Sequence, residues 1–167
     1  MTERTERIVD APAIVSAYDW GALGHVVDVG GGDGTLLIAL LNEYPTLNGT
    51  VVDLPATAEI ARKMIEAAGL ADRAGAVAGD FLGELPDGAE GYLLSSILHE
   101  WSDEDACAIL RNCARAAGED GAVFVIEPDG AGGRGVPELT ACAENAGLVV
   151  TAVHTAGTTA IVELSAR

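Results

Sequence analysis

A glycine-rich segment with a carboxylate inside it is the strongest chemical signal in the sequence. It spans residues 26–34, reads VVDVGGGDG, and begins as a run of valines typical of a buried strand. Glycines at a strand-to-helix junction let the backbone approach a ligand closely. The spacing from Asp28 through Gly30 and Gly32 does not match the G-x-G-x-x-G pattern of dinucleotide-binding proteins. Asp33 would repel a pyrophosphate at the start of the next helix, so the segment favours an uncharged sugar or a cationic ligand.

Two further carboxylates follow the next two predicted strands. Asp53 ends one strand, and its two oxygens can accept hydrogen bonds from adjacent ribose hydroxyls. Asp80 follows the other strand and can accept from an exocyclic amine, while the ring of Phe81 can pack against a base. Taken singly, Asp53 can be a helix cap, Asp80 a turn residue and the glycine segment a tight turn. Together they predict an adenosine site without a phosphate grip, which fits S-adenosyl-L-methionine (SAM) with its sulfonium cation.

A histidine beside an acid and a tryptophan is the third signal. Residues 97–105 read ILHEWSDED, and His99 follows the fourth predicted strand, at the same sheet edge as the glycine segment. A histidine placed there can act as a general base. The alternative is a partly buried histidine that bonds to a loop carbonyl, with Trp101 covering the core. The spacing alone leaves both interpretations open.

The segments that must position these residues alternate between strand-like and helical patterns. Short apolar runs predict strands over residues 26–29, 50–53, 75–78, 91–98 and 123–127. Apolar residues recur at helical spacing over 36–44, 60–68 and 106–117. Strands and helices in alternation are typical of an α/β fold with a mostly parallel sheet covered on both faces. The last two runs, 148–155 and 159–165, are too close in sequence for a crossover and predict an antiparallel hairpin at the sheet edge.

Residues typical of helix ends flank these patterns. Asp10 precedes Ala-Pro and is a predicted N-cap, and Ser102 stands three residues before an acid in a capping-box arrangement. Gly69 and Gly118 fall where two helices are expected to stop.

Length and charge bound the function. The 167 residues fit one domain, 1–167. The net charge of −17 argues against a nucleic-acid or anionic-membrane partner, because phosphates would be repelled. No apolar run approaches the ~20 residues of a membrane span, and the N-terminus is polar, so we expect a cytoplasmic protein.

The three cysteines give a separate expectation. Cys107, Cys113 and Cys142 form no C-x-x-C pair. We expect neither a disulfide framework nor a metal site, and interpret all three as small buried groups on helices.

Five sequence blocks, taken together, resemble a known family. VVDVGGGDGTLL, GTVVDLP, GDFL, LHEWSDEDACAILRNC and VFVIE occur in the order and spacing of the class I SAM-dependent O-methyltransferases of the plant caffeate/flavonoid and bacterial polyketide-tailoring type. The resemblance implies a Rossmann-like sheet of seven strands in the order 3-2-1-4-5-7-6. It also implies SAM as cofactor, S-adenosyl-L-homocysteine (SAH) as product and a phenolic or polyketide-type small molecule as acceptor.

The resemblance also implies residue roles. The family's H-[DE]-W histidine deprotonates a hydroxyl, which implies His99 as general base with Glu127 as its acidic partner. The acid after the second strand binds ribose, which implies Asp53, and the Gly-Asp-hydrophobic segment binds adenine, which implies Asp80 and Phe81. The full set of expected SAM-binding residues is Asp28, Gly30, Gly32, Asp53, Leu54, Gly79, Asp80, Phe81, Ser95 and Trp101.

The sequence departs from the family's pattern on the acceptor side. Ser95 stands where plant relatives often carry a lysine, and aligning Arg134 with a family arginine leaves Gly133 where a second acid is expected. Relatives have an N-terminal dimerisation domain, and a helical segment where this chain has PDGAGGRGV. We therefore expect a catalytic core, monomeric where full-length relatives are homodimers, that binds SAM better than it turns it over. The alternative is a SAM-binding module with little or no methyl transfer.

Overall fold

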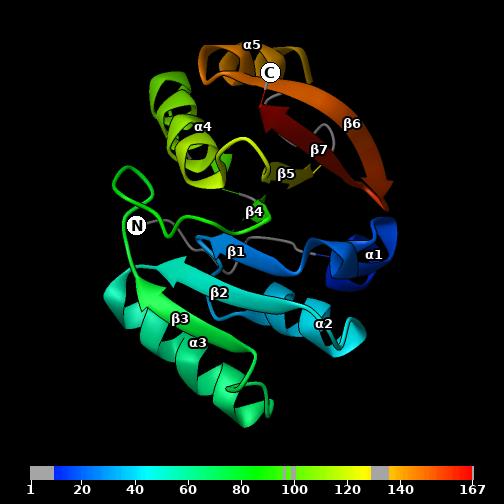
Figure 1. Cartoon of the computed structure of the whole chain (residues 1–167), viewed down its shortest axis with the longest axis vertical. Helices are drawn as coiled ribbons and strands as arrows, with labels where there is room; N and C mark the ends of the chain where they lie inside the picture. The colour runs from blue at the N-terminus through cyan, green and yellow to red at the C-terminus, as the bar shows by residue number, and fades with distance from the viewer. Residues whose placement is uncertain (1–9, 96, 99–100, 129–135, 167) are drawn as a thin grey trace.

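A seven-stranded sheet forms the centre of the computed structural model, which describes residues 10–95, 97–98, 101–128 and 136–166 (Figure 1). The strand order is β3-β2-β1-β4-β5-β7-β6. β7 runs antiparallel to both of its neighbours, and the other neighbouring strands pair in parallel. The strands are β1 (His25–Val29), β2 (Asn48–Asp53), β3 (Ala74–Ala78), β4 (Gly91–Ser95), β5 (Ala122–Pro128), β6 (Leu148–Ala156) and β7 (Thr159–Ala166). The predicted strands, order and terminal hairpin are confirmed.

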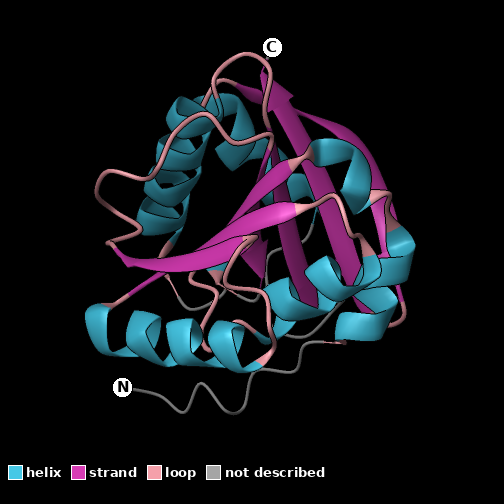
Figure 2. Cartoon of the chain, turned by 60° about the horizontal axis from the view of Figure 1, so that its bottom comes forward, coloured by secondary structure: helices cyan, strands magenta, loops and turns pink. Residues whose placement is uncertain are grey.

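Helices cover both faces of this sheet (Figure 2). They are α1 (Ala11–Ala17), a 3-10 turn η2 (Trp20–Leu23), α2 (Thr35–Glu43), α3 (Pro55–Ala67), α4 (Asp103–Ala117) and α5 (Val136–Asn145). Successive strand residues alternate between two cores: Val27 packs on the side of α4 and α5, whereas Val26 packs on the side of α1, α2 and α3. Burial on both faces explains why the central strands have continuous apolar sequences. Within the described residues, no helix combines the length and apolarity that crossing a membrane requires.

The predicted helix ends have the expected chemistry. Asp10 Oδ1 accepts a hydrogen bond from the Ala13 N–H at 3.2 Å, and Ser102 Oγ accepts one from the Asp105 N–H at 3.1 Å. Gly118 is the C-cap of α4 and has φ 67°, a positive value that residues other than glycine rarely adopt. α4 therefore begins and ends at defined residues beside the carboxyl and amino ends of the sheet.

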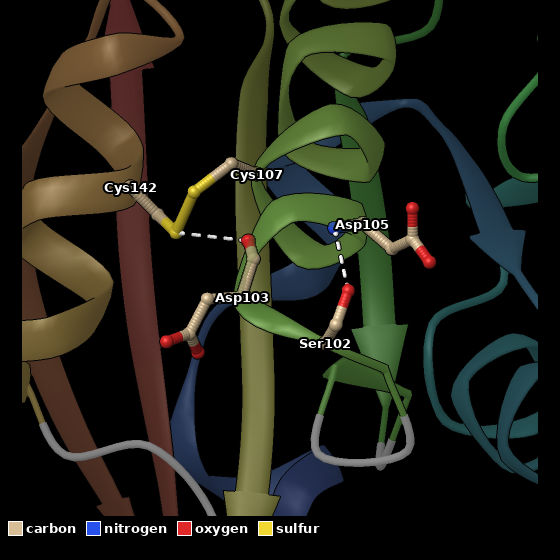
Figure 3. Close-up of a disulfide and its surroundings, with 5 residues drawn as sticks. All are labelled: Ser102, Asp103, Asp105, Cys107 and Cys142. Atoms are coloured by element: carbon tan, nitrogen blue, oxygen red, sulfur yellow. Dashed lines mark hydrogen bonds between the residues drawn. A yellow bond between two sulfur atoms is a disulfide. The ribbon is translucent and has the colours of Figure 1, made fainter.

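The expectation that the chain forms no disulfide is wrong. Cys107 of α4 and Cys142 of α5 are bonded, with their Cα atoms 5.0 Å apart (Figure 3). The pair is 35 residues apart in sequence, and the cysteines meet because both helices pack on the same face of the sheet. Cys113 is a free, buried thiol, and burial raises its pKa to about 12. All three cysteines lie on helices, as predicted.

Candidate active site

Asp53 joins the ends of the first two strands. It is the last residue of β2 and only 5% exposed. Its Oδ2 accepts a hydrogen bond from the Gly32 N–H at 2.9 Å, and its Oδ1 accepts one from the Leu54 N–H at 2.7 Å. The Gly30 N–H donates to the Val52 carbonyl at 2.7 Å, which adds a second tie between the glycine segment and β2. The structure therefore brings the glycine segment and Asp53 together at the carboxyl edge of the sheet.

The glycines at this edge are required because neighbouring side chains approach their backbone closely. Gly30 has φ 72°, and a Cβ there would lie 2.6 Å from Ile97 Cδ1 and 2.9 Å from Phe81 Cζ. A Cβ on Gly31 would lie 2.9 Å from Cγ of Asp28, which is buried in β1. Gly31 was not among the predicted site residues, although the unbroken glycine run was a signal for it. The backbone here lies directly against carboxylates and apolar side chains.

The segment after β3 turns back on itself at Asp80. The Asp80 side chain is exposed, its Oδ1 accepts from the Leu82 N–H at 3.0 Å, and its carbonyl accepts from the Gly83 N–H at 2.9 Å. The Gly79 N–H donates to the Asp53 carbonyl at 2.9 Å, so this segment begins beside Asp53. Asp80 thus forms a turn, as one interpretation of the sequence allowed, and also presents its carboxylate to solvent at the predicted edge.

Phe81 points inward. Its side chain is 7% exposed, its ring contacts the backbone at Gly30, and its centroid lies 6.3 Å from that of Trp101. Its carbonyl oxygen accepts a hydrogen bond from Asn112 Nδ2 at 2.8 Å. Leu54, by contrast, is 59% exposed beside the buried Asp53 and offers an aliphatic surface to a flat ring. The motif did not indicate which of these two apolar side chains faces solvent.

Glu127 binds the backbone between β4 and α4. It is buried in β5, and its Oε2 accepts a hydrogen bond from the Leu98 N–H at 3.1 Å. Ser95 is buried at the end of β4, and the Trp101 N–H donates to the Leu98 carbonyl at 3.1 Å. His99, next to Leu98, lies outside the described residues, as do Gly133 and Arg134. Glu127 therefore holds the backbone at Leu98, the residue before His99 in the sequence.

Two further observations concern metal binding and a groove away from this edge. Among the described residues, no group of three or more His, Cys, Asp or Glu side chains could hold a metal ion. A groove of about 400 Å³ lies at the far end of α4, where Arg111, Arg115 and Glu119 are among its lining residues. That groove is at the amino ends of the parallel strands, on the opposite edge from Asp53.

Known proteins match nearly the whole chain. A family model described as the O-methyltransferase domain matches residues 2–159. The 2,7-dihydroxy-5-methyl-1-naphthoate 7-O-methyltransferase of Streptomyces carzinostaticus is 45% identical over 95% of this chain and 53% of its own. Aclacinomycin 10-hydroxylase RdmB of Streptomyces purpurascens is 49% identical over 71% of this chain and 31% of its own.

A solved structure shares the fold. NcsB1, an O-methyltransferase from neocarzinostatin biosynthesis crystallised with S-adenosylmethionine and 2-hydroxy-5-methyl naphthoic acid, superposes with a TM-score of 0.89 at 47% identity. The match covers 92% of this chain and 52% of that one. The chain thus spans about half the length of NcsB1 and of the naphthoate methyltransferase.

Proposed function

The chain belongs to the O-methyltransferase domain family, and on that premise we propose that it binds SAM and methylates a hydroxyl of a phenolic or polyketide-type small molecule. The observation that carries the proposal is the Asp53 carboxylate, which accepts hydrogen bonds from the glycine segment and from the start of α3. It places a buried acceptor at the junction where a ribose is expected. NcsB1, with the same fold, was crystallised with SAM and a hydroxynaphthoic acid.

The residues at this edge fit SAM chemically. A carboxylate has about four lone-pair sites, and Asp53 uses two of them on backbone N–H groups, which leaves about two for ribose hydroxyls. Asp80 is exposed and can accept from the adenine amine, and Leu54 can cover the ring. Asp28 lies directly against Gly31. Its carboxylate would repel a phosphate and favour a cation, such as the sulfonium of SAM. Bound SAM supplies the electrophilic methyl group and a positive charge.

The protein's own task in the reaction is to align the acceptor and remove its proton. We propose His99 as the general base, with Glu127 fixing the adjacent backbone at Leu98. An ordinary phenol has a pKa of about 10 and a histidine about 6.5, so the proton transfer needs help from a nearby positive charge. SAM held at this edge would supply that charge.

A second candidate function is a SAM-binding protein that does not transfer methyl. One observation favours it: the 49% identical relative RdmB is named as a hydroxylase. In that case the chain would bind SAM and SAH with comparable affinity and leave phenols unmodified.

We also propose that the chain is a monomer. Its net charge of −17 favours this state through repulsion between copies, and light scattering at low concentration will test it.

The test pairs a calorimetric titration of SAM with single-turnover transfer of a labelled methyl group to a panel of hydroxynaphthoates, catechols and polyketide phenols. We expect micromolar binding and slow transfer. Asp53→Asn should weaken SAM binding by roughly 1.5–3 kcal/mol, the range for hydrogen bonds to a charged group. His99→Ala should leave binding unchanged and abolish transfer.

Asp72→Asn is the matched control, because Asp72 is exposed and precedes β3 at the amino edge of the sheet. Asp53 also supports the backbone, so each variant's thermal unfolding is measured alongside binding. No binding of SAM by the wild-type chain would refute the proposal. Binding without transfer to any phenol would favour the second function.

A further inference from the structure

We propose that Asn112 and Arg115 of α4 form a positioning pair that fixes the Asp80–Phe81 segment in the conformation that recognises adenine. This rests on the proposed function. Asn112 Nδ2 donates to the Phe81 carbonyl at 2.8 Å, and Arg115 Nη1 donates to Asn112 Oδ1 at 3.0 Å. The pair links a helix on one face of the sheet to a loop that lies 31 residues earlier in the chain.

The chemistry at both ends orients the Asn112 amide in the same way. An arginine side chain only donates hydrogen bonds, so it must face the amide oxygen. A backbone carbonyl only accepts, so the Phe81 oxygen must face the amide nitrogen. An aspartate at this position would keep the contact with Arg115 and lose the donor to Phe81.

Phe81 is held at two points. Its ring is enclosed between Gly30 and Trp101, and its carbonyl is held by Asn112. Asp80 comes directly before it and is exposed, with its carboxylate bonded within its own turn to the Leu82 N–H. The position of the Asp80 carboxylate relative to Asp53 therefore depends on where the Phe81 backbone is anchored.

The two hydrogen bonds of Asn112 should contribute unequally to fixing the Asp80–Phe81 segment. The bond to Phe81 is partly buried, whereas the bond to Arg115 is exposed to solvent. A partly buried hydrogen bond contributes more when its partner cannot turn to water instead. We therefore expect Asn112 to carry most of the effect and Arg115 to refine it.

The test uses two ligands that differ at the adenine amine: SAH, and S-inosyl-homocysteine, in which a carbonyl replaces that amine. Both are titrated calorimetrically into the wild-type chain, Asn112→Asp, Asn112→Ala and Arg115→Ala, with Arg111→Ala as a control on the same helix. We expect the wild-type chain to prefer SAH at least tenfold, because a site built for an N–H rejects an analogue that lacks it.

In Asn112→Asp and Asn112→Ala that preference should fall to less than threefold, with a three- to tenfold loss of SAH affinity. Arg115→Ala should lose less than threefold in affinity, and Arg111→Ala nothing. A merely structural role for Asn112 would lower thermal stability and leave the preference at its wild-type value, which would overturn the proposal. If the Asn112 variants fail to fold, Arg115→Ala decides instead: its preference for SAH should fall measurably below the wild-type value, because Asn112 loses the donor that orients its amide, and a preference equal to that of Arg111→Ala would overturn the proposal. A wild-type chain that binds neither ligand would overturn the proposed function itself.

Discussion

Asp53 accepts one backbone N–H from the glycine segment and another from the start of α3. The sequence allowed two interpretations of this residue, a helix cap and a ribose acceptor. The structure does not support the cap: the N-cap of α3 is Leu54, which has no side-chain cap bond, and Asp53 accepts from the Leu54 N–H one position before the helix. These backbone bonds are compatible with the proposed ribose contact, because one carboxylate can accept from several donors at once.

The free thiol of Cys113 predicts an alkaline loss of stability. Burial raises its pKa from 9.0 to about 12, so above pH 9 the unfolded chain releases this proton while the folded chain keeps it. The free energy of unfolding should therefore fall as pH rises above 9, by at most about 1.4 kcal/mol per pH unit from this group.

Urea denaturation of the wild-type chain and of Cys113→Ala between pH 8 and 10 checks this prediction. Tyrosines whose pKa burial raises, such as Tyr92, add to the decline near pH 10, but they do so equally in both proteins. Cys113→Ala should flatten the decline. Equal slopes for the two proteins would contradict the burial of the thiol.

The sequence predicted which residues lie at this edge of the sheet better than it predicted where their side chains point. Asp53, Gly30 and Asp80 came from motif positions at strand ends, where a parallel sheet gathers its carboxyl termini. The inward orientation of Phe81 depends on the space between Gly30 and Trp101, which no local pattern contains. Asn112 carries no signal in sequence, because it is one polar residue on a helix with an ordinary apolar pattern.

The helix α4 connects the proposed general base with the proposed adenine-binding segment. It begins at Asp103, four residues after His99, and Asn112 in its middle donates to the Phe81 carbonyl. Its N-cap is Ser102, which accepts the Asp105 N–H. Ser102→Ala should lower the free energy of unfolding by roughly 0.5–2 kcal/mol, whereas Ser102→Asp should retain most of it.

Ser16→Ala is the control, because Ser16 is exposed inside α1 and caps nothing there. Chemical denaturation measures all three variants. A loss in Ser16→Ala as large as that in Ser102→Ala would contradict the capping assignment.

The elements themselves were predictable because each depends on local pattern. All seven strands were expected within a few residues, since burial on both faces demands continuous apolar runs and the tight final link demands a hairpin. The Cys107–Cys142 bond was missed because it depends on how α4 and α5 lie together on the sheet. Sequence spacing says nothing of that packing.

At the scale of the whole molecule, the disulfide should stabilise the fold. It closes a loop of 35 residues, for which the chain-entropy model gives about 4 kcal/mol, at the upper end of the typical range of about 2–4 kcal/mol. Adding a reductant should lower the urea midpoint of the wild-type chain. The double variant Cys107→Ser, Cys142→Ser should start lower and not respond to reductant.

Thiol counting provides an independent check of the same bond. In denaturant without reductant the chain should show one reactive thiol, and after reduction three, matching its three cysteines. Three thiols before reduction would contradict the pairing.

The disulfide also determines how the molecule can be pulled apart. β5 lies inside the covalent loop, whereas both strands that pair with it, β4 and β7, lie outside. A force applied to the two ends of the chain can strip those neighbours away, yet it cannot stretch β5 while the bond is intact. At ~3.6 Å per residue, the oxidised chain should extend about 120 Å less than the reduced chain. An enzyme that threads the chain from one terminus would have to pass three segments of polypeptide together behind the bond, namely the two arms of the loop, which contains Glu127, and the remaining tail.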